Sequence, residues 1–222
     1  MRPTATDPPP AAQRERARNP RGHGEHLRAE ILDAVAALLD NRVANPDLNL
    51  SLREVARTTG IATQSVYLHF PDKNALAWAV AEDGYTRLLE AMRTAADHAT
   101  GGAADRLRAQ AHAFIGFADT NRGVFRLMFG HDVSRFDSPH HRHPGTELWR
   151  QWLLATRACE AEGHRWPSGA DIAAQHVWAA LLGRYSLWSA TFANDTTVSL
   201  TEFTDYLLDD LLANAPASKD KP

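Results

Sequence analysis

Residues 51–69 carry the signals for two short helices joined by a tight turn. Ser51 and Glu54 fit the S-x-x-E capping box, in which the serine side chain accepts from an orphan backbone N–H and the glutamate bonds back to the cap. Gly60 predicts the end of the first helix, because glycine readily takes the left-handed conformation that closes a helix. A second helix is expected at 63–69. The segment therefore predicts two short helices around a glycine-containing turn.

This pair of helices has the shape of a helix-turn-helix, whose second helix enters the major groove of DNA. Val66 is the inward residue of that second helix, so its neighbours face outward or sideways. Glutamine can pair with adenine through two hydrogen bonds, serine and threonine can bond to base edges or phosphates, and leucine can touch a thymine methyl group. For Leu68, contact with the core is an equal alternative. The outward set is Thr63, Gln64, Ser65, Tyr67 and Leu68.

Residues 52–76 read LREVARTTGIATQSVYLHFPDKNAL. This run resembles the DNA-binding signature of the TetR family of transcription regulators. The resemblance implies that Tyr67 and His69 bond to phosphates, and that Lys73 holds a phosphate at the start of the next helix. Family members often carry serine where Ala62 stands; alanine cannot cap a helix, and Thr63 is the alternative cap. The expected DNA-contacting set is Ser51, Arg53, Thr63, Gln64, Ser65, Tyr67, Leu68, His69 and Lys73.

The rest of the chain places apolar residues at helix spacing, and no segment alternates with period two. The pattern predicts an all-α fold of about nine helices, with an N-terminal three-helix helix-turn-helix domain and a helical ligand-binding and dimerisation domain. The first helix is expected from residue 25 to the turn at 45–47. The helices that follow the recognition helix are expected at 73–98, 103–119, 122–130, 145–162, 169–193 and 199–213.

Charge divides the chain into a front and a back part. Residues 1–73 hold 10 Lys/Arg and 9 Asp/Glu, a net charge of +1, and residues 74–222 hold 14 and 18, a net of −4, which together give −3. The overall value argues against nucleic acid as a partner, but the front part is slightly basic. We expect a disordered basic arm at 1–22, a helix-turn-helix DNA-binding domain at 23–73, a helical regulatory and dimerisation domain at 74–214 and a tail at 215–222. The arginines of the arm either reach the minor groove or stay in a solvated tail.

The resemblance to the TetR family also implies an effector site among the fifth to eighth helices. Ligand pockets are concave and mostly apolar, with a few polar groups that orient the ligand. Aromatic residues at helical spacing form plain core more often than a pocket, so both alternatives stay open here. The candidate ligand-binding residues are Phe114, Phe117, Met128, Trp149, Trp152, His176 and Trp178.

The last two helices carry apolar stripes that they would bury only partly against each other. In the TetR family such helices form a four-helix dimer interface. A dimer would place two recognition helices about 34–36 Å apart, one turn of DNA, as a palindromic site requires. The expected interface residues are Leu181, Tyr185, Trp188, Phe192, Phe203, Leu207 and Leu211.

A histidine-rich loop at 131–143 is the one candidate metal site in the sequence. It contains His131, Asp132, Asp137, His140, His141 and His143. Imidazole and carboxylate groups bind zinc or nickel. The loop lacks a regular scaffold to fix four ligands, however, so we expect no metal and no cofactor.

Other functional classes lack their signatures. No nucleophile elbow, P-loop, dinucleotide fingerprint or HExxH motif occurs, so we expect no enzyme. No apolar run reaches the roughly 18 residues that cross a bilayer, and the first residues contain no apolar signal region. The single cysteine, Cys159, excludes an internal disulfide framework. A cytoplasmic protein without a membrane partner is expected.

These patterns predict a homodimeric, sequence-specific regulator, a repressor that a small hydrophobic or aromatic effector releases from a palindromic operator. The expected partners are double-stranded operator DNA, the effector and a second copy of the chain. One alternative is a TetR-like architectural DNA-binding protein without a small-molecule inducer. Another is a metal-sensing repressor that uses the histidine-rich loop.

Overall fold

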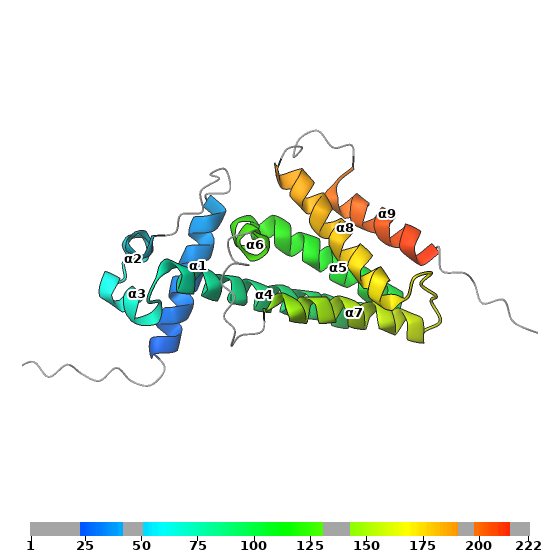
Figure 1. The fold of residues 1–222 in the computed structure, drawn as a ribbon, viewed down its shortest axis with the longest axis horizontal. Coiled ribbons are helices and arrows are strands. Elements are labelled where there is room, and N and C mark those ends of the chain that lie inside the picture. The colour runs from blue at the N-terminus through cyan, green and yellow to red at the C-terminus, as the bar shows by residue number, and fades with distance from the viewer. Residues whose placement is uncertain (1–22, 42–50, 131–142, 191–197, 214–222) are drawn as a thin grey trace, which may run out of the picture.

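A computed structural model describes residues 23–41, 51–130, 143–190 and 198–213 of the chain. Within these ranges it contains nine helices and no strand (Figure 1). The helices are α1 (His23–Asn41), α2 (Leu52–Thr59), α3 (Thr63–His69), α4 (Lys73–His98), α5 (Ala103–Thr120), α6 (Arg122–Phe129), α7 (Gly145–Ala161), α8 (Ala170–Ala190) and α9 (Leu200–Ala213). The expected all-α fold is confirmed, and the described helix bounds lie close to the expected ones.

The first three helices pack together at one end of the molecule (Figure 1). Their apolar sides meet in the core, where Val35 of α1, Val55 of α2 and Val66 of α3 are fully buried. The long helix α4 runs from this group into the rest of the molecule and packs against α1, α5, α6 and α7. Any change in the direction of α4 therefore affects both the first helices and the regulatory helices.

The ends of the short helices only partly follow the expected capping pattern. Gly60 closes α2 in the left-handed conformation, with φ 68°, as expected. Ser51 is the N-cap residue of α2, as expected, but the expected side-chain bond is wrong, since its side chain forms no cap hydrogen bond among the described residues. The same S-x-x-E pattern is instead used by Ser199 and Glu202 at the start of α9. There the glutamate accepts from the serine N–H at 2.9 Å, and the serine Oγ accepts from the glutamate N–H at 3.1 Å.

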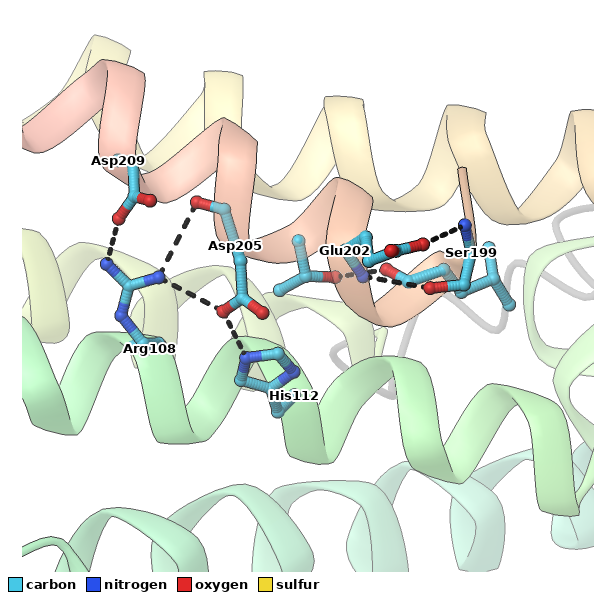
Figure 2. Close-up of polar contacts among 8 residues, drawn as sticks. Arg108, His112, Ser199, Glu202, Asp205 and Asp209 are labelled. Carbon is cyan, nitrogen blue, oxygen red and sulfur yellow. Dashed lines mark hydrogen bonds and ion pairs between the residues drawn. The ribbon is translucent and has the colours of Figure 1, made fainter. Parts of the chain in front are cut away.

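A polar cluster attaches α9 to α5 (Figure 2). Arg108 donates to the carboxylates of Asp205 at 3.1 Å and Asp209 at 2.5 Å. His112 Nε2 lies 2.8 Å from the same Asp205 carboxylate. The hydrogen bond from His112, and then the Arg108 guanidinium, lower the pKa of the Asp205 carboxyl. These contacts fix the last helix against the centre of the regulatory part.

Helix α6 connects the regulatory helices to the first helix of the chain. It packs against both α1 and α4. At its N-terminal end, the backbone N–H of Gly123 donates to Asp40 Oδ1 of α1 at 2.6 Å. At its C-terminal end, Tyr85 of α4 donates its hydroxyl to the Met128 carbonyl at 3.0 Å. The two ends of α6 therefore contact α1 and α4 respectively.

None of the described helices is long and apolar enough to span a bilayer. No group of three or more His, Cys, Asp or Glu side chains in the described ranges is arranged to hold a metal ion. Most of the histidine-rich loop, including His131, His140 and His141, lies outside those ranges.

Candidate functional site

Helix α3 is short, and it packs on the core through one side and through the residue that follows its C-terminal end. It begins at Thr63 after Ala62, and neither residue supplies a side-chain cap; the backbone carbonyl of Ala62 accepts from Ser65 and Val66 N–H at 2.8 and 3.3 Å. Val66 is fully buried and Phe70, just after the helix, is 2% exposed. The Arg28 guanidinium of α1 lies 5.5 Å from the Phe70 ring centroid. The opposite side of the helix is left facing solvent.

The solvent-facing side of α3 carries the side chains expected to read DNA. Thr63 and Gln64 are exposed, Ser65 and His69 are partly buried, and Tyr67 is 46% exposed. Leu68 is 80% exposed, so it does not contact the core, and the alternative that the sequence left open for it is wrong. An exposed apolar side chain can contact an apolar group on a partner.

The start of α4 lies directly after this helix. Asp72 caps it by accepting from the N–H groups of Asn74 and Ala75, both at 2.8 Å. Lys73 is the first residue of α4 and is exposed. Ser51 and Arg53 are exposed at the start of α2. The charged and polar side chains expected to bond to phosphates are therefore accessible at the ends of their helices.

Two adjoining pockets open among the regulatory helices. One, of about 570 Å³, is formed by α4, α6, α7 and α8; the other, of about 450 Å³, lies between α7 and α8. Trp149 and Trp178 line both, with ring centroids 6.4 Å apart and ring planes at 25°. The first is also lined by Tyr85, Met128, Phe129, Gly130, His143, Gly145 and Thr146. The second is also lined by Gln175, Ala179 and Leu182.

Two polar side chains on these walls bond to the backbone. The Tyr85 hydroxyl donates to the Met128 carbonyl, and burial raises the pKa of this phenol well above its usual range. His143 Nδ1 accepts from Gly145 N–H at 3.0 Å, and its ring meets those of Trp78 and Tyr85 edge-on. The Trp178 Nε1–H is buried and has no hydrogen-bond partner among the described residues.

Comparison with known proteins identifies both parts of the chain. Residues 48–80 match the family model described as bacterial regulatory proteins, tetR family, and residues 107–211 match the tetracyclin repressor-like C-terminal domain. The chain belongs to the TetR family. It is therefore a DNA-binding transcription regulator, and regulators of this family are not enzymes.

Solved structures show the same fold. A protein with unknown function from Rhodococcus sp. RHA1 is 25% identical, with a TM-score of 0.70 over 90% of this chain and 100% of that one. A bacterial regulatory protein in the tetR family from Rhodococcus RHA1 is 20% identical, with a TM-score of 0.64 over 86% and 98%. AibR, in complex with isovaleryl coenzyme A and operator DNA, is 14% identical, with a TM-score of 0.63 over 82% and 98%.

The expected ligand-binding residues of this TetR-family chain fall into three groups. Met128, Trp149 and Trp178 line the pockets. Phe114, Phe117 and Trp152 are buried in the core and line neither pocket. His176 is exposed on α8 and also lines neither. The sequence did not single out the remaining walls as ligand-binding, among them Tyr85 of α4, Phe129 of α6 and His143 just before α7.

The expected dimer interface needs a correction. Leu181 is fully buried and Tyr185 is 4% exposed within the single chain, where the Tyr185 hydroxyl donates to the Ala118 carbonyl at 2.8 Å. Burial raises the pKa of this phenol to about 12. Neither side chain is therefore accessible for contact with a second copy. Trp188, Phe203, Leu207 and Leu211 are partly exposed and remain candidates, and Phe192 lies outside the described residues.

We predict that Leu68 reads a thymine methyl group in the operator. Replacing that thymine by deoxyuridine should weaken binding of the wild-type protein roughly fourfold per contacted methyl, the effect of burying one such group. Leu68→Ala should bind more weakly and respond little to the replacement. Gel shifts with the two duplexes and both proteins measure the four affinities. An equal response of the two proteins to deoxyuridine would exclude the contact.

Proposed function

We propose that this regulator is a homodimeric repressor that leaves a palindromic operator when a small hydrophobic or aromatic molecule binds among α4, α6, α7 and α8. The observation that carries the proposal is the aromatic pocket bounded by α4 and α6, because these two helices also pack against α1 of the DNA-binding part. A molecule that enters the pocket therefore touches the elements that position the recognition helix. The complex of AibR with isovaleryl coenzyme A and operator DNA supports ligand response in this fold.

The proposed mechanism is a shift between two arrangements of the dimer. Without effector, the two α3 helices hold the separation of adjacent major grooves, about 34–36 Å. The effector favours a different tilt of α4, which changes that separation. It acts only if it binds the DNA-incompetent arrangement more tightly than the other, because equal affinity for both shifts nothing.

The proposed dimer uses the outer side of α8 and α9. Leu187 of α8 is 59% exposed and Tyr206 of α9 is 60% exposed, so both large apolar side chains are available to be covered by a second copy. Ala179 and Gly183 are also exposed on α8, and nothing lies within 4 Å of a Cβ placed at Gly183. Small residues beside larger apolar ones permit close helix packing between two copies.

Selection of DNA from a random-sequence duplex library tests the function. We expect the full-length protein to enrich an inverted repeat whose half-sites lie about 10–10.5 bp apart centre to centre, or a multiple of this spacing. Sedimentation of the enriched complex should give an even number of protomers per duplex. Binding along the duplex with no enriched sequence would contradict the repressor and favour an architectural protein.

A further inference from the structure

The walls of the larger pocket are built to receive flat rings. Trp149 and Trp178 contribute nearly parallel indoles, at 25°. Tyr85 and Phe129 also line the pocket, and their rings meet at 66° with centroids 5.6 Å apart. Aromatic rings prefer offset-stacked and edge-to-face contacts, and this arrangement offers both to a planar ligand.

No described residue that lines either pocket is an aspartate, glutamate, lysine or arginine. A charged ligand would leave water for an apolar site without a partner of opposite charge, which is unfavourable. The phosphates of an acyl coenzyme A would need arginine or lysine side chains, and the described walls provide none. These walls therefore favour an uncharged molecule.

Among the described pocket-lining residues, one side-chain donor is buried and has no acceptor. The Tyr85 hydroxyl and His143 Nδ1 are engaged with the backbone, whereas Trp178 Nε1–H is buried and bonds to no described group. Trp152 Nε1 is the other such donor among the described residues, but Trp152 lines neither pocket. A buried unpaired donor is costly, so a ligand that supplies an acceptor gains more than one that does not.

We infer that the effector is an uncharged, planar aromatic molecule with a hydrogen-bond acceptor, a carbonyl or a ring nitrogen, that pairs with Trp178 Nε1–H. The rings lie against Trp149 and Trp178, and the Trp178 indole turns to bring its buried N–H to the acceptor. This inference rests on the proposed function, since it names the ligand class of the same pocket.

Four two-ring probes of similar shape test this ligand class by equilibrium dialysis against the full-length protein without DNA. Quinoline carries a ring-nitrogen acceptor and is uncharged at neutral pH. Naphthalene lacks the acceptor, N-methylquinolinium blocks it and adds a positive charge, and naphthoate adds a negative charge. We expect quinoline and naphthalene to bind, and both ions to bind much more weakly than quinoline.

The variant Trp178→Phe keeps an aromatic wall but replaces the indole, and its N–H, by a smaller ring, and the comparison of two probes of the same shape cancels the change in size. The ratio of quinoline to naphthalene affinity should fall about five- to tenfold in this variant, the usual contribution of one hydrogen bond. Trp188→Phe, on the same helix but outside both pockets, should leave the ratio unchanged.

Three results would overturn the inference: an unchanged ratio in Trp178→Phe, an ion that binds as tightly as quinoline, or no binding by any of the four probes. None of them bears on DNA recognition. The selection of an inverted repeat from the duplex library therefore decides separately whether the proposed repressor function fails.

Discussion

Replacing Gln64 by alanine and Tyr67 by phenylalanine together is expected to abolish operator binding in a protein that remains folded. Gln64 is exposed on α3, and its amide can pair with one adenine, a contact of about 1–3 kcal/mol. The Tyr67 hydroxyl, on a side chain 46% exposed, is expected to donate to a phosphate, which contributes about 1.5–3 kcal/mol. Each loss occurs twice in a dimer. The total of roughly 5–12 kcal/mol removes essentially all specific affinity.

The double variant keeps the buried side of α3, because Val66 and Phe70 are unchanged. Helix content by circular dichroism, the sedimentation coefficient and the melting temperature should therefore match those of the wild type. Thr94→Ala, at an exposed position of α4, is the control and should bind the operator normally. A gel shift in which the double variant retains wild-type affinity would show that α3 does not read the bases.

The helices were predictable because their signals are local. Gly60 ends α2, and the spacing of apolar residues places α5 and α7 close to their observed bounds. Caps were less predictable, because the same four-residue pattern occurs at Ser51 and at Ser199 and is used only at the second site. The serine side chain must also take the rotamer that reaches the backbone, and a pattern of residue types does not contain that information.

The pockets were only partly predictable because their walls come from four separate helices. Trp149 and Trp178 were expected from their aromatic character and their place in the family fold, and they do line the pockets. Trp152 lies one turn after Trp149 and was expected with it, yet it turns into the core and meets Phe114 at 5.7 Å. Helical spacing defines a face of a helix, but the packing of neighbouring helices determines which part of that face stays open.

The stripe on α8 shows the same limit. Periodicity grouped Leu181 and Tyr185 with Trp188, but the first two pack inside the chain and only the third is partly exposed. At Trp188 the Arg122 guanidinium of α6 covers the ring from 4.7 Å. An apolar stripe predicts burial, and it does not distinguish burial in the same chain from burial against a second copy.

Contact between α1 and α6 depends on a residue without a side chain. A Cβ placed on Gly123 would lie 2.6 Å from the Asp40 nitrogen and closer still to the Leu39 carbonyl group. These are backbone atoms in a helix, so they cannot move aside as the end of a flexible side chain does. The hydrogen bond from Gly123 N–H to Asp40 Oδ1 requires the same close approach.

Gly123→Ala is therefore expected to separate α6 from α1 and to destabilise the protein by about 3 kcal/mol, the upper part of the usual range for overpacking. For a chain of this size, that lowers the melting temperature by roughly 6–12 °C. Gly116→Ala is the matched control, because Gly116 lies within α5 with nothing within 4 Å of its Cβ, and it should be neutral or slightly stabilising. Calorimetry of the two variants compares them directly, and equal melting temperatures would mean that the α1–α6 contact is looser than the structure describes.

Asp40→Ala separates the two contributions, because it removes the hydrogen bond to Gly123 N–H without adding an atom between the helices. We expect a smaller loss of stability than in Gly123→Ala, about 1–2 kcal/mol, since one backbone donor is left unpaired but no atom is added between the helices. If α6 carries the effector signal to the DNA-binding part, Asp40→Ala should also weaken the release of DNA by effector while leaving effector affinity nearly unchanged. The fraction of DNA released at saturating effector distinguishes a loss of signal transfer from a loss of stability. A loss of stability alone would leave this fraction unchanged for the folded protein.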